Sequence, residues 1–558
     1  MGKKFNPLSV VFLGGVGEIG KNLTAIKYGD QILIVDCGST FPSLDTPGVD
    51  LIVPDFSYLK ENEDKIVGLV ITHGHEDHIG GIPYLLKLVP HIPIYGSDLA
   101  VALINHKLTE KGVNTARLNV VEPNDKIKLG VFEVEFLQVA HSIIGAYALS
   151  ITTPRGIIFH TGDYKIDYTP IGNSKPVDIS TFARVGNKGV LLMLGESTNV
   201  EKPGTTISEK HVGKTLDKIF MANPDKRIII STFASNVNRI QQIIRIAEKS
   251  GRKVAFSGRS MIKICEMALD MGLISMDREN LVEVEHLKDY PREKTCILST
   301  GSQGEPMSAL TRMANGMDKI VVQDGDLIVL SSSAIPGNEK AIYTIINNLY
   351  RRGAKVMYGS LEELHVSGHA CREELKMMLS LIRPKFFIPV HGEFRHLKQH
   401  AKLAQDLGIK EDHIEIADIG DEIEIKTKKM QKLEKVQAGA MFVDGDGQIT
   451  HEQIKERRQL SNEGVIVAVC KVNKQEKVLS DEMQLEMRGI SLKDEDIEEV
   501  KQCIIKAFLA QDLANKAFNE KEFVKVAAKK VANRMAKLTT QKPVVIPIVI
   551  EDTGEINE

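Results

Sequence analysis

The sequence predicts an α/β protein with more than one domain. Apolar runs that read as strands, such as residues 66–71 and 156–160, end in histidine or acidic side chains. In the middle of the chain, strand, polar loop and helix follow one another repeatedly, which is the pattern of a parallel sheet covered by helices. The chain of 558 residues also exceeds the size of a single hydrophobic core, so we expect roughly two to four domains.

The first strand end of interest is THGHEDH at residues 72–78, which contains His73, His75, Asp77 and His78. Imidazole nitrogens and carboxylate oxygens are the ligands that zinc and similar divalent ions prefer. Asp77 and His78 open a helix-like stretch that turns them back toward the same volume. A solvated polar turn is the alternative, but four ligand-type residues in this order favour a metal site.

Three later strand ends supply more residues of the same kind. Residues 131–140 alternate apolar and polar side chains and end at His141, residues 156–160 run into Asp163, and residues 385–390 end at His391. Each is weak evidence alone, because a single histidine after a strand is usually solvated or capped. Four independent strand ends of one type predict a shared site.

One motif fits a different function. GVGEIG at residues 15–20 matches the G-x-G-x-x-G dinucleotide fingerprint, and Asp36 lies near the expected acidic position. The fingerprint requires a helix, but residues 21–28 alternate like a short strand and a turn at Gly29-Asp30 leads into another strand. We therefore do not expect nucleotide binding at this motif.

Composition sets further limits. Hydrophobic and charged fractions of 42% and 26% are those of an ordinary soluble globular protein. No apolar run approaches about 18 residues, and the first residues lead into a strand, so we expect a cytoplasmic protein without membrane contact. The six cysteines are scattered without a CxxC pair, which indicates reduced thiols and argues against a cysteine metal site. A net charge of −3 decides little about a nucleic-acid partner.

The middle of the chain predicts a phosphate-binding cleft. Strands at residues 228–230, 295–298 and 326–330 each enter a loop rich in serine or threonine, at residues 231–236, 299–304 and 331–333. The first loop contains Ala234, Ser235 and Asn236 and precedes a helix, whose N-terminal N–H groups suit a phosphate. Loops at the carboxyl ends of parallel strands meet at one edge of the sheet, which favours a shared cleft over three unrelated turns.

HGHEDH, His141, the TGD at residues 161–163 and PVHGE at residues 389–393 together resemble the metallo-β-lactamase superfamily, and in detail the bacterial ribonuclease J family. The resemblance covers nearly the whole chain. The other similar segments are LGGVGEIGKN (13–22), GVDLIVPD (48–55), GESTN (195–199), FASNVNR (233–239), GRSM (258–261), TGSQGEPMSALTR (300–312), IPGNE (335–339), HVSGH (365–369) and RPKFFIPVHGE (383–393).

This resemblance implies an αββα sandwich, a β-CASP parallel-sheet domain inserted into it, and a small α/β C-terminal domain. The implied boundaries are residues 1–208 and 363–430 for the sandwich, 209–362 for the insert, 431–455 for a linker and 456–558 for the last domain. Residues 426–435 read as a basic connector, and residues 492–513 and 521–538 as helices. The last helix is basic, which suits RNA contact or a solvated face equally. The family's C-terminal domain implies a homodimer or homotetramer, or a heteromer with a paralogous subunit.

The resemblance also implies roles for the site residues. Two divalent ions, zinc or alternatively manganese or magnesium, would be held by His73, His75 and His141 and by Asp77, His78 and His391, with Asp163 bridging them. Glu196 or His369 would protonate the leaving 3′-oxygen. The RNA phosphate would be bound by Ala234, Ser235, Asn236, His365, Val366, Ser367, Gly368 and His369.

Two positions depart from the family pattern. Glu196 stands where ribonuclease J sequences usually have aspartate, although an acid is retained. Residues 143–146, Ile-Ile-Gly-Ala, replace a common Pro-acid-Ser sequence beside His141. This second change leaves ligation by His141 intact and alters the surface next to the leaving group.

Three classes of function are compatible with these observations. The leading one is a metal-dependent ribonuclease with endonuclease and 5′-to-3′ exonuclease activity, preferring 5′-monophosphate ends, in mRNA decay and in maturation of rRNA and other RNA. The second is a small-molecule metallohydrolase, which has no need of the insert. The third is a weakly active or non-catalytic partner subunit of a ribonuclease J complex, which the seven intact ligands disfavour.

Overall fold

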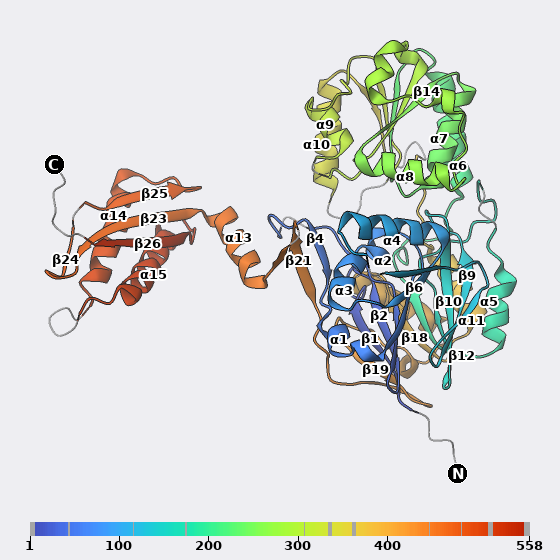
Figure 1. The fold of residues 1–558 in the computed structure, drawn as a ribbon, viewed down its shortest axis with the longest axis horizontal. Coiled ribbons are helices and arrows are strands. Elements are labelled where there is room, and N and C mark those ends of the chain that lie inside the picture. The colour runs from blue at the N-terminus through green and yellow to red at the C-terminus, as the bar shows by residue number, and fades with distance from the viewer. Residues whose placement is uncertain are drawn as a thin grey trace. The chain divides into compact units, whose positions relative to one another are not determined.

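The computed structural model describes residues 6–42, 45–114, 116–172, 176–305, 307–332, 338–359, 364–445, 447–480, 482–511 and 517–551. Its contacts group into two units (Figure 1). One contains Met1–Thr40 with Val53–Ala440, and the other contains Phe41–Ile52 with Met441–Glu558. Within the described residues, no helix combines the length and apolar character that a membrane span requires.

The first unit contains a sandwich of two sheets. The eight-stranded sheet has the order β20-β19-β1-β2-β3-β5-β6-β7, and its strands from β3 to β7 are parallel. The strands are β1 (Leu8–Gly14), β2 (Leu23–Tyr28), β3 (Gln31–Val35), β5 (Ile66–Val70), β6 (Pro93–Gly96), β7 (Arg117–Val120), β19 (Glu422–Ile425) and β20 (Met430–Lys432).

The six-stranded sheet of the sandwich has the order β18-β12-β11-β10-β9-β8. Its strands β11, β12 and β18 are parallel to one another. The strands are β8 (Lys126–Leu129), β9 (Phe132–Val139), β10 (Ala146–Thr153), β11 (Gly156–His160), β12 (Val190–Glu196) and β18 (Phe386–Val390). Apolar side chains of both sheets, such as Phe12 and Phe136, form one buried core, which holds the layers together.

Helices cover the outer faces of the sandwich. The helices are α1 (Ser57–Glu61), α2 (Glu76–Ile79), α3 (Ile82–Leu88), α4 (Asp98–Glu110), α5 (Ile179–Asn187), α11 (Arg372–Ile382) and α12 (Phe394–Asp406). α5, α11 and α12 pack on the six-stranded sheet through a second buried cluster that includes Phe182, Leu379 and Phe387. α11 ends at Ile382, because Arg383 adopts a left-handed conformation (φ 49°) and Pro384 cannot continue the helix. This arrangement is the predicted αββα sandwich.

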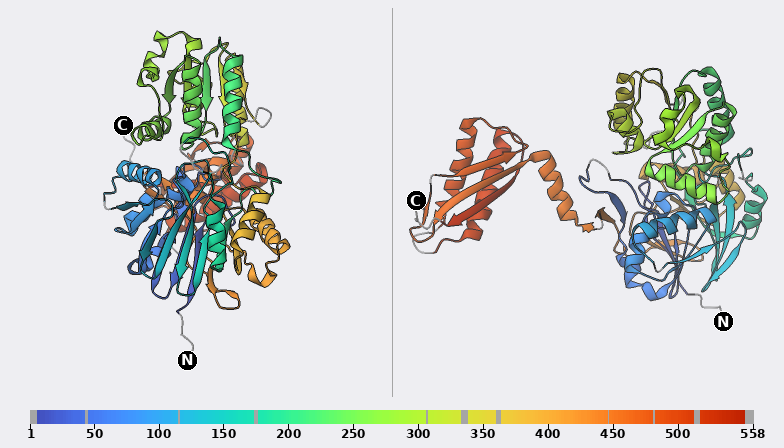
Figure 2. Two further views of the ribbon diagram at one scale, coloured as in Figure 1. Left: turned by 90° about the vertical axis from the view of Figure 1, so that its right-hand side faces the viewer. Right: turned by 45° about the horizontal axis from the view of Figure 1, so that its top comes forward.

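A five-stranded parallel sheet is inserted between β12 and β18, with the order β14-β15-β13-β16-β17. Figure 2 shows its strands flanked by helices. Its elements are α6 (Glu209–Ala222), β13 (Ile228–Ser231), α7 (Val237–Lys249), β14 (Lys253–Ser257), α8 (Arg259–Asp270), β15 (Thr295–Ser299), α9 (Ala309–Asn315), β16 (Leu327–Leu330), α10 (Glu339–Arg351) and β17 (Lys355–Met357).

The sequence pattern explains this insert. α7 buries Ile240, Ile243, Ile244 and Ala247, which recur at helical spacing, and Asn236 caps its first turn by accepting from the Arg239 N–H. The three predicted strand-to-loop junctions belong to neighbouring strands β15, β13 and β16, so the parallel-sheet prediction is confirmed. The predicted motif parts at residues 333, 306 and 335–337, and the boundary at residues 362–363, lie outside the described residues.

The second unit contains the C-terminal α/β domain. Its elements are β21 (Ala440–Asp444), β22 (Gly447–Ile449), α13 (His451–Glu463), β23 (Val465–Asn473), β24 (Val478–Leu479), β25 (Gln484–Arg488), α14 (Asp494–Phe508), α15 (Glu520–Leu538) and β26 (Val544–Glu551), and β4 (Leu51–Pro54) joins β21 in a three-stranded sheet. α14 and α15 pack on one face of the sheet around β23. The helix predicted for residues 492–513 is shorter than expected and ends at Phe508.

Two local predictions have clear outcomes. β1 is followed by antiparallel β2 rather than by a helix, which confirms that GVGEIG is not a dinucleotide fingerprint. The expected basic connector at residues 426–435 is wrong in part, because β20 within it pairs with β19 at the sheet edge. Residues 431–455, expected as a linker, include β21, β22 and the first turn of α13.

Candidate metal centre

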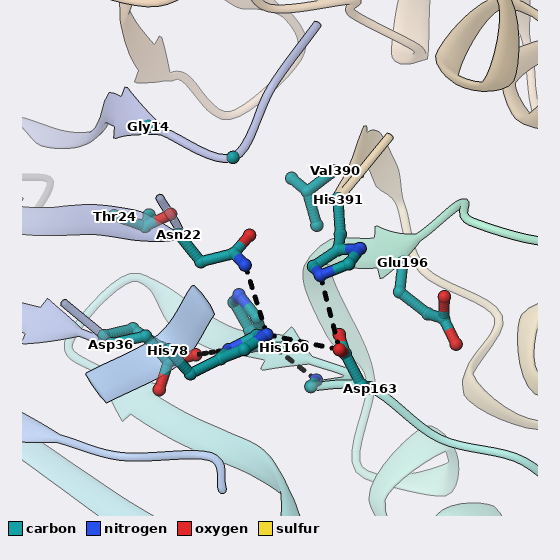
Figure 3. Close-up of a pocket in the computed structure, with 13 residues that line it drawn as sticks. Gly14, Asn22, Thr24, Asp36, His78, His160, Asp163, Glu196, Val390 and His391 are labelled. Atoms are coloured by element: carbon teal, nitrogen blue, oxygen red, sulfur yellow. Dashed lines mark hydrogen bonds and ion pairs between the residues drawn. The ribbon is translucent and has the colours of Figure 1, made fainter. Parts of the chain in front are cut away.

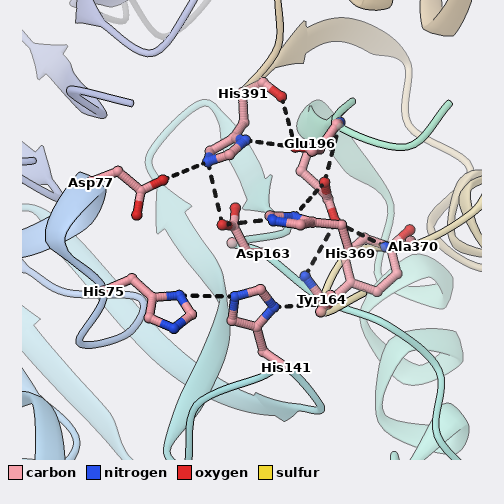
Figure 4. Close-up of polar contacts among 12 residues, drawn as sticks. His75, Asp77, His141, Asp163, Tyr164, Glu196, His369, Ala370 and His391 are labelled. Atoms are coloured by element: carbon pink, nitrogen blue, oxygen red, sulfur yellow. Dashed lines mark hydrogen bonds and ion pairs between the residues drawn. The ribbon is translucent and has the colours of Figure 1, made fainter. Parts of the chain in front are cut away.

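The predicted metal ligands lie in the segments that follow four strands of the two sheets, and two of them, Asp77 and His78, belong to the short helix α2 after β5. His73 and His75 follow β5, Asp163 follows β11 and His391 follows β18. Figure 4 shows side chains from both sheets pointing toward one another. The structure brings together all seven predicted ligands, in the two groups His73-His75-His141 and Asp77-His78-Asp163-His391; within each group the donor atoms lie within 4.8 Å of one another.

The first group presents three ring nitrogens to one point. His75 Nδ1 lies 3.1 Å from His73 Nε2 and 3.1 Å from His141 Nε2. His141 Nδ1 lies 2.7 Å from the Gly368 carbonyl oxygen, which only accepts hydrogen bonds, so Nδ1 carries the proton. His141 Nε2 therefore directs a lone pair inward, as a metal ligand must.

The second group is built around one carboxylate oxygen. Asp163 Oδ2 lies 3.2 Å from His78 Nε2 and 3.3 Å from His391 Nε2, and His391 Nε2 lies 3.1 Å from Asp77 Oδ2. The same oxygen of Asp163 is 3.7 Å from His73 Nε2 in the first group. Asp163 thus lies between the two groups and is placed to serve both.

A tight turn presents Asp163. Gly162 has a left-handed φ of 54°, and a Cβ atom there would lie 2.4 Å from the Tyr147 carbonyl oxygen. The Gly162 N–H donates to His160 Nδ1 at 3.0 Å. Glycine is required here by both conformation and space, which explains the TGD sequence in physical terms.

Three groups that orient the ligands were not predicted from the sequence. Asp36 accepts from His78 Nδ1 at 2.7 Å, and Thr198 Oγ1 lies 2.7 Å from His391 Nδ1. Asn22 Nδ2 lies 3.1 Å from His78 Nε2 and donates to the Asp77 carbonyl oxygen at 2.9 Å. Such partners fix ring orientation and proton position. The available signal is that Asp36 also follows a strand, β3.

The glycine-rich loop after β1 also supports the centre. The His391 N–H donates to the Gly15 carbonyl oxygen at 2.7 Å, and Gly17 and Glu18 form bridges with Glu393 and Gly392. Figure 3 shows Gly14, Asn22, Asp36, His78, Asp163 and His391 around a small cavity. Its volume is about 10 Å³, enough for roughly one water-sized sphere.

The histidines of the two donor groups differ in their pKa values. Burial lowers the pKa of His75 to about 4 and holds the pKa values of His73 and His141 well below their ordinary value, so these rings are neutral ligands. Burial also acts to lower the pKa of His391, but the carboxylates of Asp163 and Asp77 prevail and raise it to about 9. Without a metal ion, the histidines of the second group therefore hold protons, which balance the charge of its carboxylates.

The donor set fits divalent metal ions. Neutral imidazoles and two carboxylates converge, and burial opposes ionisation of Asp77 and Asp163, yet the neighbouring histidines hold their pKa values well below the usual range. Nitrogen and oxygen donors of this kind suit zinc, manganese and similar ions. The described cysteines contribute no ligand to these groups.

His369 and Glu196 adjoin the second group. His369 Nδ1 lies 3.2 Å from Glu196 Oε2 and 3.8 Å from Asp163 Oδ2. Burial acts to lower the pKa of His369, but the Glu196 and Asp163 carboxylates raise it above the ordinary value. Backbone N–H groups of Tyr164, Thr198 and Ala370 donate to the buried Glu196 carboxylate at 3.2–3.4 Å.

The predicted RNA-binding residues fall into two sets. The segment containing His365, Val366, Ser367, Gly368 and His369 lies against the centre through Gly368 and His369. Ser367 Oγ accepts from Asn199 Nδ2 at 2.7 Å and from the His369 N–H at 3.2 Å. Ala234, Ser235 and Asn236 lie at the N-terminus of α7, and no contact of these three with the metal-ligand side chains is seen among the described residues.

Arg239 joins the two sets, a role that the sequence did not reveal. Its fully buried guanidinium donates to both carboxylate oxygens of Glu209, at 2.6 and 3.0 Å, and to the Ser331 carbonyl oxygen at 2.6 Å. It also lies 3.1 Å from His365 Nδ1. Burial and the nearby Arg239 lower the pKa of His365 to about 3, so this ring is neutral.

The fold and the site define a metallohydrolase of the metallo-β-lactamase class with a β-CASP insert, and comparisons with known proteins agree. Residues 16–179 match the metallo-beta-lactamase superfamily, and residues 225–349 match the ribonuclease J beta-CASP domain. Residues 353–416 match the Zn-dependent metallo-hydrolase RNA specificity domain, and residues 452–552 match the ribonuclease J C-terminal domain. The superfamily match implies divalent metal binding.

Individual relatives give the family. The chain is 38% identical to ribonuclease J of Mycolicibacterium smegmatis, covering 98% of this chain and 97% of the relative. It is 37% identical to ribonuclease J2 of Bacillus subtilis (98% and 99%) and 43% identical to ribonuclease J of Synechocystis (84% and 73%). The chain belongs to the ribonuclease J family.

A solved structure supports the fold alone. A protein of unknown function from Enterococcus faecalis superposes with a TM-score of 0.54 at 20% identity, covering 75% of this chain and 100% of the other.

Proposed function

We propose that this chain is a cytoplasmic metal-dependent ribonuclease that hydrolyses RNA phosphodiester bonds with two divalent ions. The proposed activity is of two kinds, a 5′-to-3′ exonuclease activity that prefers 5′-monophosphate ends and an endonuclease activity. The proposed roles are in mRNA decay and RNA maturation. The observation that carries the proposal is the pair of donor groups that share Asp163 beside the His369–Glu196 pair. The family and its RNA specificity domain support RNA as the substrate.

The residues suit the two ions differently. His73, His75 and His141 would hold one ion, and Asp77, His78 and His391 the other, with Asp163 shared. Bound ions would offset charge on the phosphate oxygens and make water a better nucleophile. Zinc fits the nitrogen-rich first group, and manganese or magnesium fits the carboxylate-containing second group.

We assign proton donation to His369 and the positioning of His369 to Glu196. The raised pKa keeps the imidazolium of His369 populated near neutral pH. Its Nδ1–H is engaged by Glu196, so its Nε2–H remains for the leaving 3′-oxygen. Help from a general acid matters because an alkoxide is a poor leaving group. Glu196 is held by three backbone N–H groups, which suits an orienting carboxylate better than a proton donor.

The 5′-phosphate preference is supported by the surroundings of His365 and Ser367. Lys202, Lys165 and Arg239 all contribute positive potential at His365. The N-terminus of α7 at Ala234, Ser235 and Asn236 adds backbone N–H groups. A terminal monophosphate carries more charge than an internal phosphodiester and gains more from this field.

Self-association through the C-terminal domain is part of the proposal, as a homodimer or homotetramer or with a paralogous subunit. β26 pairs only with β23 among the described strands. Its Ile546, Ile548 and Ile550 are 45%, 43% and 48% exposed, which leaves an apolar strand surface uncovered. Sedimentation of wild-type protein and of the triple serine variant at these positions would measure the oligomer; an unchanged oligomer would exclude this surface.

The activity is tested with purified protein, stripped of metal and reloaded with zinc, manganese or magnesium. Equal amounts of one RNA with a 5′-monophosphate or a 5′-triphosphate serve as substrates. We expect turnover only with metal and faster turnover of the monophosphate, and we expect His78→Ala to abolish it without unfolding. Failure to cleave either RNA at full metal occupancy would exclude the proposal, and equal rates would exclude its 5′-end part.

A further inference from the structure

A second cavity lies beside the metal centre. Its volume is about 350 Å³, at the lower end of the range of about 300–1,000 Å³ for small-ligand sites. His141 lines it, as do Gln138 of β9, Asn236 of the insert and residues 142–145 of the loop after β9. The cavity therefore adjoins the first metal group and the α7 N-terminus, and its size suits one nucleoside rather than an oligonucleotide.

Lys165 lines this cavity and lacks a hydrogen-bond acceptor. Lys165 is 3% exposed, and its ammonium lies 3.9 Å from Asp167 Oδ2, beyond hydrogen-bond length. No described residue accepts a hydrogen bond from it. Asp167 is itself occupied by the N–H groups of Thr169 and Glu209. Because Lys165 lines the cavity and its ammonium has no acceptor among the described residues, an acceptor atom of a ligand in the cavity would complete its surroundings.

Ser97 is a second unpartnered group on the cavity wall. Its Oγ is buried and has no hydrogen-bond partner. Gly145 packs against it with a left-handed φ of 77°, and a Cβ at Gly145 would lie 2.5 Å from Ser97 Oγ. The Ile143-Ile144-Gly145 segment, which departs from the family pattern, thus forms an apolar wall with one hydroxyl behind it.

The lining favours a nucleobase over a phosphate. The lining contains Asp98, Glu122 and Asp167 against the single cation Lys165, and Glu209 in it is paired with Arg239. This balance offers a phosphodiester less than the positive surroundings of His365 do. A base is uncharged, its faces suit the isoleucine wall, and its edge carries acceptors for Lys165 and Ser97. Guanine and uracil place a carbonyl oxygen where adenine and cytosine place an amino group, and an ammonium can only donate.

We propose that this cavity binds an unpaired nucleobase next to the scissile phosphodiester and that Lys165 selects guanine or uracil by donating to their carbonyl oxygen. The inference rests on the RNA hydrolysis proposed above and names a base preference for it.

The test uses short 5′-monophosphorylated RNAs that differ in one nucleotide on either side of the cleaved bond. That nucleotide is A, C, G, U or an abasic unit, and cleavage is followed with manganese-loaded protein. At one of these positions we expect wild-type protein to favour G and U over A and C by about tenfold, the effect of one charge-assisted hydrogen bond. Lys165→Met should remove this preference. Because Lys165 also adds to the positive potential at His365, the abasic RNA serves as the reference that measures any loss common to all RNAs.

A second variant and a control variant distinguish loss of base recognition from misfolding of the protein. Ser97→Ala removes a hydroxyl that bonds to nothing in the protein, so the fold should be unchanged while the preference falls by about 2- to 10-fold. The exposed Lys126→Met should behave as wild type. Equal rates for the four bases at every position would overturn the inference. So would a Lys165→Met protein that lowers all rates, that of the abasic RNA included, by the same factor and keeps the preference for G and U, which indicates a phosphate contact alone. No cleavage of any RNA would overturn the proposed function together with this inference.

Discussion

Replacement of Asp36 by asparagine tests how the second metal group is held in place. The Asp36 carboxylate is buried and accepts three hydrogen bonds, from His78 Nδ1 at 2.7 Å and from the Thr72 N–H and Oγ1 at 2.8 Å each. Asp36 has a left-handed φ of 59°, which asparagine tolerates, so the change should not strain the backbone.

The asparagine amide would reverse the proton position on His78. Its oxygen must face the Thr72 N–H, so its NH₂ group faces His78 Nδ1 and requires a lone pair there. The proton then moves to His78 Nε2, where it blocks ligation. Loss of such an orienting partner typically costs about 10- to 100-fold in metal affinity, or about 1.4–2.7 kcal/mol.

Titration calorimetry with manganese and metal analysis after dialysis would measure the loss, with circular dichroism as the check on folding. Asp421→Asn is a matched control, because Asp421 is also buried but accepts from Lys432 and the Asp418 N–H rather than from a metal-site residue. Wild-type affinity and stoichiometry in Asp36→Asn would refute the reasoning.

Three further predictions concern the centre and its support. Gly368→Ala places a Cβ 2.7–2.8 Å from the His141 ring, so metal analysis should find lower occupancy of the His73-His75-His141 group. Full occupancy would contradict this contact. Metal affinity should rise with pH up to about 9 in calorimetric titrations, because Asp163 and Asp77 raise the pKa of His391 to about 9 and metal must displace the proton that this ring holds; an affinity independent of pH would oppose this. Arg239→Met leaves the buried Glu209 carboxylate unpaired and should lower the free energy of unfolding in urea by about 3–5 kcal/mol, with partial recovery in the double variant Arg239→Met/Glu209→Gln; an undiminished midpoint would exclude this role.

The ligand set could be predicted from the sequence because each ligand lies within a few residues of a strand end, or, as with Asp77 and His78, in the short helix that follows one. A strand followed by a turn and a histidine or acid is visible in a few adjacent residues, as at His141 and Asp163. The partners that orient the ligands depend instead on which strands are neighbours. Asp36 reaches His78 because β3 lies beside β5, with Val35 opposite Val70, and the sequence does not encode that pairing locally.

Polar strands at a sheet edge are also difficult to predict from sequence. Residues 426–435 read as a connector because β20 has no alternating apolar pattern. Its place at the edge of the sheet, where β19 is its one partner among the described strands, needs few apolar contacts. Lys432 in this strand is held by ion pairs with Asp421 and Glu415. The polar and charged residues of β20 therefore do not show the alternation that predicts a strand, although backbone pairing and ion pairs hold it in the sheet.

The insertion between β12 and β18 has a consequence for synthesis of the chain. β18 lies beside β12, with Leu192 opposite Phe386, so this part of the sheet forms only after the whole insert has been made. His391 follows β18 and is the last ligand to emerge from the ribosome. At about 5–20 residues per second, the ribosome needs on the order of 10–40 s to pass from β12 to β18. Nascent chains of the earlier length lack a complete second donor group, so the geometry withholds hydrolysis until most of the protein has been translated.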